Sequence, residues 1–290
     1  MRTKYTGIVL SGASGGLGRA LACEFARPGC ALLLLGRDTS RLKAAAEDAR
    51  ARGSIARYAS LDIGNHRALN ATVADFEARF PIDLVVANAG VKCRNERGIE
   101  PFDQVARIVN VNLLGTISIV QAALPYLADR GKGRIAIVSS LSAHAPQADL
   151  LSYSATKAAV RAYGIALRRR LRSEGIDVSV IEPGFVDTPM TRRHMGWTPN
   201  KLAARDAARL IVRRLERQQS VIGFPYLLWL ISRLDGFVPA RLSDLLNRSL
   251  RAEILPDPDE ANSDLWPGRQ NAVVGEEITR KGCQNADEKL

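Results

Sequence analysis

The chain has 290 residues, 46% of them hydrophobic, and carries a formal net charge of +11. This length and composition describe an ordinary globular protein with a sizeable core, in one large α/β domain or two small ones. No secretory signal is expected, and no uninterrupted apolar run approaches the ~20 residues that span a bilayer. The four cysteines lack CxxC or metal-ligand spacing, so we expect reduced thiols, no metal site and a cytoplasmic protein: Cys23, Cys30, Cys93 and Cys283.

The positive charge is unevenly distributed. Residues 256–290 contain eight acidic and four basic side chains, which leaves −4 on this tail and +15 on the rest of the chain. A basic body fits a polyanionic partner such as nucleic acid, an anionic membrane surface or a phosphorylated cofactor, or simply a solvated arginine-rich surface. The one dense basic cluster, at 168–172, is typical of a helix surface, so no nucleic-acid partner is predicted.

A glycine-rich loop follows the first expected strand, residues 5–11, and precedes a helical pattern at 19–26. Glycines at 12, 16 and 18 let the backbone turn sharply and approach a pyrophosphate closely. The helix N-terminus then offers unpaired N–H groups to the phosphates. Because the glycines stand in a strand–turn–helix context, the loop predicts a nucleotide-binding site rather than a ligand-free turn.

The second expected strand, residues 30–35, ends at Gly36-Arg37-Asp38. An acid at this place accepts hydrogen bonds from the ribose of NAD, whereas an arginine accommodates the 2′-phosphate of NADP. Arg37 therefore favours NADP(H), with NAD(H) as the alternative. Asp38 is one position late for the ribose and is expected to cap the helix that begins near Thr39.

Polar residues follow the next strands at the same edge of the expected sheet. Asp62 comes after strand 54–60 and either meets the cofactor or caps the helix at 66–80. Asn88-Ala89-Gly90 closes strand 82–87 and either admits a cofactor ribose or merely ends the strand. Asn112 lies in an apolar helical stretch, where a buried amide needs partners, as a structural bridge or as part of a proton relay.

Three further strands are expected at 134–140, 177–181 and 221–223, with helices between them. Strands that alternate with helices in this way predict an α/β fold, a Rossmann-type doubly wound parallel sheet of about seven strands. Tyr153 and Lys157 lie four residues apart in the helix after the fifth strand, so they share one helix face. A nearby cation favours the ionised form of an acid and would lower the pKa of the phenol, which is ordinarily near ~10.

The glycine loop, the polar residues after the strands and the Tyr153–Lys157 pair follow one another in the order and spacing of a known family. From about residue 5 to residue 225 the chain resembles the short-chain dehydrogenase/reductase family. Ser140 lies thirteen residues before Tyr153, a spacing familiar from the family. Ser11 departs from the usual threonine but keeps a hydroxyl. The resemblance implies these cofactor contacts: Ser11, Gly12, Ser14, Gly16, Leu17, Gly18, Arg37, Asp62, Ile63, Asn88, Ala89, Gly90, Tyr153, Lys157, Pro183, Gly184, Val186 and Thr188.

The resemblance also implies four catalytic roles. Tyr153 would be the general acid in carbonyl reduction and the base in the reverse direction, and Lys157 would hold the nicotinamide ribose. Ser140 would bind the substrate oxygen beside Tyr153, and Asn112 would hold a water that links Lys157 to solvent. These roles imply an NADP(H)-dependent oxidoreductase acting on a small carbonyl or alcohol, and relatives suggest a homo-oligomer, a dimer or a tetramer.

The stretch after Thr188 is harder to interpret, and its least standard part begins at Phe224. Residues 189–197 form a mobile substrate-covering loop in the family, and here the loop carries His194, which could contact the substrate but for which no catalytic role is expected. Residues 224–255 are an apolar extension that we expect to end in a helix reaching about residue 254. It would pack on the core or a second subunit, wall the substrate site, or lie on a membrane through about 224–250. Residues 1–255 are expected to form one catalytic domain, and 256–290 a disordered tail.

The apolar extension suggests a lipophilic substrate: an acyl chain, a 3-oxoacyl thioester, a sterol-like ring or a polyketide. An alternative is a reductase step in cell-envelope lipid or polysaccharide assembly. A second alternative is a catalytically silent NADP(H)-sensing protein, which the complete set of catalytic residues disfavours. The cytoplasm is the expected location, with the cytoplasmic membrane surface as the alternative.

Overall fold

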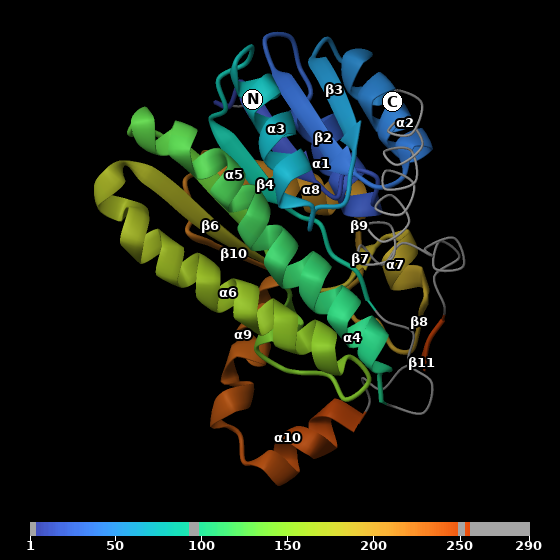
Figure 1. Cartoon of the computed structure of the whole chain (residues 1–290). Coiled ribbons are helices and arrows are strands. Elements are labelled where there is room, and N and C mark those ends of the chain that lie inside the picture. The colour runs from blue at the N-terminus through green and yellow to red at the C-terminus, as the bar shows by residue number, and fades with distance from the viewer. Residues whose placement is uncertain (1–3, 93–98, 249–252, 256–290) are drawn as a thin grey trace, which may run out of the picture. The chain divides into compact units, whose positions relative to one another are not determined.

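A parallel sheet of seven strands organises the chain, as the sequence predicts (Figure 1). The computed structural model describes residues 4–92, 99–248 and 253–255. From one edge to the other, the strands are β10 (Val221–Phe224), β6 (Ile176–Pro183), β5 (Gly133–Val138), β4 (Leu84–Ala87), β1 (Gly7–Ser11), β2 (Ala31–Gly36) and β3 (Ile55–Ser60). The chain order reverses between β1 and β4, and ligands of such folds bind outside the carboxyl ends of the strands at this point.

Helices cover both faces of the sheet (Figure 1). Successive residues of a strand point to opposite faces, so Ile8 and Leu10 join one buried cluster while Val9 joins the other. The first cluster includes residues of α1 (Gly16–Phe25), α2 (Thr39–Arg50) and α8 (Ala204–Glu216). The second includes residues of α3 (His66–Glu77), α5 (Gly115–Asp129) and α6 (Leu151–Leu171).

Helix α5 continues a helical segment that begins with α4 (Phe102–Ile108), and a π-helical turn, Val109–Leu114, joins the two. The segment Phe102–Asp129 is long and apolar enough to cross a membrane by length and composition alone. Its apolar side is used within the protein, because Ile119 and Val120 are fully buried in the second cluster. Buried core helices can have the same length and apolar composition as a membrane span. This segment alone therefore indicates no membrane span.

Two small sheets extend the fold beyond the sequence prediction. β7 (Val186–Asp187) pairs with β9 (Leu202–Ala203) in parallel, and β8 (His194–Met195) pairs with β11 (Glu253–Ile254) in antiparallel fashion. Between β7 and β8 lies the short helix α7 (Pro189–Arg192). Single-turn 3₁₀ helices follow β5 and α6, at Leu141–Ala143 and Arg172–Glu174.

The predicted end of the extension is wrong. It forms α9 (Tyr226–Leu234), a 3₁₀ turn at Asp235–Phe237 and α10 (Ala240–Asn247), whereas Glu253 and Ile254 are a strand. This strand leaves the helical path because its backbone bonds to β8, a partner that no local pattern reveals.

The described residues all fall in the compact unit Met1–Leu255. The tail expected to be disordered lies outside the described residues, as do Cys93 and Cys283. The other two cysteines, Cys23 and Cys30, are free thiols, as expected.

Candidate active site

The glycine loop follows β1, and its close contacts with neighbouring backbone depend on glycines having no side chain. Gly12 adopts a φ of +66°, and a Cβ there would stand 2.8 Å from Cα of Ala89. A Cβ at Gly18 would lie 2.0 Å from the carbonyl oxygen of Gly12. A Cβ at Gly16 would stand 2.9 Å from Cβ of Thr188. The fold therefore brings Ala89 and Thr188, predicted separately, against the glycine loop.

Ser11 and Asn88 join the loops after β1 and β4 through hydrogen bonds within the protein. Ser11 Oγ accepts hydrogen bonds from the backbone N–H groups of Asn88 (3.0 Å) and Ala89 (3.1 Å). Asn88 Nδ2 donates to the carbonyl oxygens of Ser11 (3.1 Å) and Gly12 (3.3 Å). Both polar side chains thus fix the glycine loop against the loop after β4, a role that the sequence did not indicate.

The end of β2 presents Arg37 to solvent, while Asp38 is engaged. Asp38 Oδ1 accepts from the backbone N–H of Arg41 (2.9 Å) and from Ser40 Oγ (2.7 Å), which confirms Asp38 as the N-cap of α2. The hydrogen bond from the Arg41 backbone, together with that from Ser40, lowers the pKa of Asp38. Ser14 packs here as well, since a Cβ at Gly36 would lie 2.8 Å from Ser14 Oγ.

Asp62 and Ile63 follow β3 at the same edge. Asp62 Oδ1 accepts from the backbone N–H of Gly64 at 2.8 Å. Helix α3 is capped by Asn65, whose Oδ1 accepts from the N–H of Ala68 at 3.1 Å. The alternative reading of Asp62 as the cap of this helix is therefore wrong, because the turn places Asn65 at the helix start. Ile63 is buried in the second cluster.

Tyr153 and Lys157 lie on α6 and are both buried. Lys157 Nζ donates to the carbonyl oxygen of Val138 (2.9 Å) and stands 5.7 Å from the centroid of the Tyr153 ring. Burial raises the pKa of Tyr153 to about 12, and a hydrogen bond with Ser140 opposes this rise. The phenol pKa is thus raised, not lowered as the sequence suggested, because burial is the largest influence on it. Burial, and secondarily the charge of Lys92, lowers the pKa of Lys157 to about 8.

Ser140 lies just beyond β5. Its Oγ accepts from the backbone N–H of Ser142 (3.2 Å), which caps the 3₁₀ turn at Leu141–Ala143. The preceding Ser139 donates from Oγ to the carbonyl oxygen of Lys157 at 2.7 Å. These bonds join the end of β5 to α6, so the fold brings Ser140, Tyr153 and Lys157 into one site.

Asn112 stands in the π-helical turn and is fully buried. Its Oδ1 accepts from the backbone N–H of Val91 (2.8 Å), and its Nδ2 donates to the Val91 carbonyl (3.1 Å) and to Thr156 Oγ1 (3.2 Å). Asn112 is therefore a structural bridge between the loop after β4 and α6, and the proton-relay role stays a prediction. The missing side chain of Gly90 leaves room here, since its Cβ would lie 3.4 Å from Lys157 Nζ.

The residues after β6 reach both the glycine loop and the extension. The backbone N–H of Gly184 donates to the carbonyl oxygen of Phe224 at 2.7 Å. Thr188 caps α7 by accepting from the N–H of Thr191 at 3.3 Å. Pro183 and Val186 are buried, and Leu17 packs partly buried against the same cluster as Val186.

Sequence reasoning missed Lys92, a buried polar side chain near Tyr153. Lys92 Nζ lies 5.1 Å from the Tyr153 ring centroid. Burial, and secondarily the charge of Arg193, lowers the pKa of Lys92 to about 8. His194 is buried on β8 with its ring 5.3 Å from that of Phe185. Lys92 comes two residues after the Asn88-Ala89-Gly90 turn, which was the one available signal.

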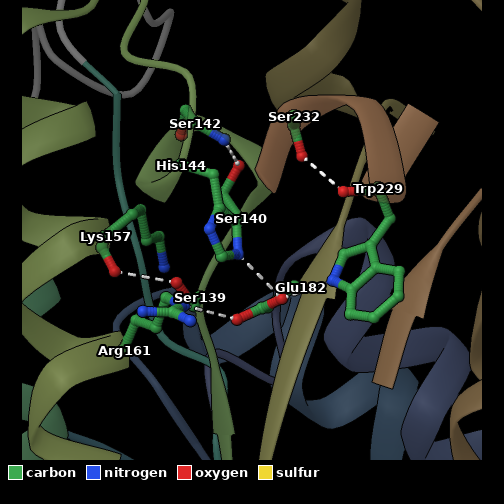
Figure 2. A network of polar contacts seen from close by, with 9 residues as sticks. All are labelled: Ser139, Ser140, Ser142, His144, Lys157, Arg161, Glu182, Trp229 and Ser232. Atoms are coloured by element: carbon green, nitrogen blue, oxygen red, sulfur yellow. Dashed lines mark hydrogen bonds and ion pairs between the residues drawn. The ribbon is translucent and has the colours of Figure 1, made fainter. Parts of the chain in front are cut away.

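A network around Glu182 was also missed (Figure 2). Glu182 is buried at the end of β6 and accepts hydrogen bonds from Arg161 Nε (2.8 Å), His144 (3.0 Å) and Trp229 Nε1. Burial alone would raise the pKa of Glu182, but the bonds from His144 and Trp229 and the nearby charges lower it overall. The network joins the segment after β5, α6 and α9 to β6. In the sequence, the only indication of it was an acidic residue, Glu182, at the end of an apolar strand.

The chain matches the family model described as short chain dehydrogenase over residues 6–198. It is 32% identical over 248 residues to an uncharacterized oxidoreductase of Myxococcus xanthus, covering 85% of this chain and 98% of that protein. A short-chain dehydrogenase from Sphingobium yanoikuyae in complex with NADPH has the same fold (24% identity, 83% and 95% of the two chains, TM-score 0.70). So does a 3-oxoacyl-(acyl-carrier protein) reductase with bound NAD from Brucella melitensis (22% identity, 76% and 89%, TM-score 0.66).

The chain belongs to the short-chain dehydrogenase family and is an NAD(P)-dependent oxidoreductase. Its glycine loop fits a dinucleotide, because side chains at Gly12, Gly16 and Gly18 are excluded by the surrounding backbone and by Thr188. The loop leads into the N-terminus of α1, where Gly15 provides no capping side chain. The first N–H groups of α1 are therefore available to phosphate oxygens.

Proposed function

We propose that the protein interconverts a carbonyl and an alcohol on a lipophilic small molecule, with NADP(H) as the preferred cofactor. The observation that carries this proposal is the site that the buried Tyr153 and Lys157 form with the partly buried Ser140. A phenol, a hydroxyl and an ammonium so placed can bind a carbonyl oxygen and exchange one proton with it.

Tyr153 is the proton donor in the reducing direction. Its pKa of about 12 keeps the phenol protonated at neutral pH, so that it can protonate the oxygen that develops negative charge. Ser140 donates a second hydrogen bond to that oxygen. The nicotinamide supplies the hydride when bound and accepts one in the reverse direction. Lys157, close to the ring, favours the phenolate that the reverse reaction needs.

The preference for NADP(H) rests on the end of β2. Arg37 is exposed there, while the carboxylate of Asp38 is used by the N-terminus of α2. An exposed arginine is available to a 2′-phosphate, and a capping carboxylate is not available to a ribose hydroxyl.

A lipophilic substrate is supported by the surroundings of Tyr153. Leu150, Tyr153 and Ile254 form a buried cluster of their own, separate from the two core clusters. Strand β11 of the extension thus contributes an apolar side chain directly to the site. Substrates of this kind include acyl chains, 3-oxoacyl thioesters, sterol-like rings and polyketides, and a reductase step in cell-envelope assembly is the alternative setting.

The extension also presents an apolar surface. Large side chains on α9, on the turn after it and on α10 are exposed: Tyr226, Leu227, Leu230, Ile231, Leu234, Phe237, Leu242 and Leu245. Patches of this kind mark contacts with a partner or a membrane. Oligomer formation, membrane-surface association and a cytoplasmic location stay predictions.

The test is the oxidation of NADPH, and then of NADH, with 3-oxoacyl, steroid and small aldehyde substrates. Tyr153→Phe keeps the ring and removes the proton donor, so turnover should fall by about 10²–10⁴-fold while NADPH binding persists. Tyr163→Phe makes the same change on the same helix and should retain activity. Equal activity of Tyr153→Phe and wild type would reject the mechanism. Tight NADPH binding without turnover of any substrate would favour the sensing protein.

A further inference from the structure

Lys92 is a second buried ammonium at Tyr153 that the proposed chemistry does not use. It lies on the loop after β4 with 9% of its surface exposed, and its Nζ is nearer to the Tyr153 ring centroid than that of Lys157, at 5.1 Å against 5.7 Å. Two lysines thus flank the proton donor. Lys157 donates to the Val138 carbonyl and has the ribose-binding role that the family resemblance implies, whereas Lys92 needs another explanation.

His194 supplies an independent observation beside Lys92. Its side chain is 5% exposed, and neither Nδ1 nor Nε2 has a hydrogen-bond partner among the described residues. The ring is held in place by Phe185 and by the pairing of β8 with β11. Ile254, the strand partner of His194, packs in one buried cluster with Tyr153, whose ring centroid lies 5.1 Å from Lys92 Nζ, so His194 and Lys92 border the same cluster. Burial, and secondarily the charge of Lys92, lowers the pKa of His194 to about 4. A buried imidazole with no partner usually has a ligand or a water to bind.

Among the described residues, Arg193 acts on the pKa of Lys92, and Lys92 and Asp149 act on the pKa of His194. Burial and Arg193 lower the pKa of Lys92, and no carboxylate of the described chain counteracts them. Glu100 is buried nearby in the chain but accepts from the backbone N–H of Ser152 at 2.9 Å. Asp149 acts on His194 in the opposite direction to Lys92. An ammonium that is buried without a matching anion is costly, and a ligand carboxylate would remove that cost.

We propose that Lys92 and His194 form an anion-binding subsite that holds a carboxylate of the substrate close to the carbonyl that Tyr153 protonates. This inference rests on the proposed function and refines it: the substrate combines an apolar body, packed against Leu150 and Ile254, with an anionic end. Lys92 supplies the charge, and neutral His194 donates one hydrogen bond from a ring nitrogen. The subsite determines specificity and takes no part in the transfer of the proton.

The first experiment measures binding and needs no turnover. The protein loaded with NADP⁺ is titrated by calorimetry with hexanoate and with hexanamide, which have the same chain and differ in charge. We expect hexanoate to bind about tenfold more tightly, as suits a charge-assisted bond in a buried site. Equal affinities, or no binding of either compound up to its solubility limit, would overturn the proposal.

Variants assign that preference to the two residues. Lys92→Met, with Lys92→Gln as a second variant should the thioether disturb packing, should abolish the preference for hexanoate. His194→Phe keeps a ring against Phe185 and should reduce it about fivefold, the effect of one lost hydrogen bond. Lys132→Met removes a lysine from an exposed loop and should leave the preference unchanged. A preference that survives in Lys92→Met would overturn the assignment.

The closing experiment separates this proposal from the proposed function. Wild type and Lys92→Met are assayed for NADPH oxidation with 4-formylbenzoate and with its methyl ester. We expect wild type to have the higher kcat/KM for the acid and Lys92→Met to lose that ratio. Turnover that depends on Tyr153 but is equal for acid and ester would reject the subsite and leave the reductase standing. A preference for hexanoate in the calorimeter without turnover of any carbonyl would reject the reductase and leave the subsite standing.

Discussion

The cofactor region and the closing region of this molecule meet at Tyr153 and are built differently. The cofactor region comprises the loops after β1, β2 and β4, and its polar side chains bond to backbone a few residues away or in the adjoining loop. The closing region comprises residues 182–195, 224–248 and 253–255, and its Glu182 bonds to side chains of other elements, such as Trp229 of α9. The first region is thus shaped by side chains bonded to loop backbone, and the second by side chains bonded to one another.

The largest effect is expected in the cofactor region, from Gly18→Ala. The new Cβ would lie 2.0 Å from the carbonyl oxygen of Gly12, and backbone at this place has no room to move. We expect a loss of about 3 kcal/mol in the free energy of unfolding, at the upper end of overpacking costs, together with loss of NADPH binding. Gly236→Ala is the control, because nothing lies within 4 Å of its Cβ. Urea unfolding and NADPH fluorescence would measure the two effects, and a stable variant that still binds NADPH would contradict the geometry.

The matching change in the closing region is Gly223→Ala on β10. Its Cβ would stand 2.1 Å from Cδ1 of Trp229, so the indole must leave its place and its bond to Glu182. We expect a loss of about 2 kcal/mol in the free energy of unfolding, since a side chain can give way where backbone cannot. NADPH affinity should be retained, which distinguishes the two regions. Tryptophan fluorescence that stays unchanged in Gly223→Ala would show that Trp229 does not depend on this glycine.

Most elements of the cofactor region could be predicted from the sequence because each has a pattern of residues that are close together in the chain. The glycine loop, the Asp38 cap and the seven strands follow from local spacing, and all are present. The closing region could not be predicted in this way. The pairing of Ile254 with His194 and the bond between Trp229 and Glu182 join residues that only the folded chain brings together.

The same distinction explains the wrong direction for the pKa of Tyr153. Sequence spacing reveals Lys157 one turn away, and a lysine alone would lower the phenol pKa. It does not reveal that Leu150 and Ile254 bury the ring, and burial is the larger effect. Ion pairs within one helix can be predicted locally, whereas desolvation depends on the whole fold.

A smaller effect is expected from Glu182→Gln. Three donors converge on the two carboxylate oxygens, and an amide has only one oxygen to offer them, so at least one donor must face an NH₂ group. We expect a loss of about 1.5 kcal/mol in the free energy of unfolding at neutral pH, the lower range for bonds to a charged group. Because His144 and Ser140 belong to one segment, turnover should fall as well.

The pH dependence of that loss provides a second check. The folded-state pKa of Glu182 lies below its ordinary value of 4.5. The carboxylate therefore contributes stability that is fully present above about 4.5 and is lost as the pH falls through the lower folded-state pKa. The difference between wild type and Glu182→Gln should shrink in that range, as measured by urea unfolding at successive pH values. A difference that stays constant down to acid pH would mean that the charge of Glu182 contributes nothing.

The smallest effect concerns the edge of the cofactor region, where Arg37 is exposed beside the engaged Asp38. Arg37→Ala should weaken NADPH binding about tenfold, equivalent to about 1.4 kcal/mol, because one charge-assisted contact in solvent is lost. NADH binding should stay nearly the same, since NADH lacks the 2′-phosphate. Arg41→Ala is the matched control, because its side chain pairs with Asp38 on the same helix end. Equal losses of affinity for NADPH and NADH would show that Arg37 attracts the phosphates that both cofactors share. The cofactor preference would then have to arise elsewhere in the site.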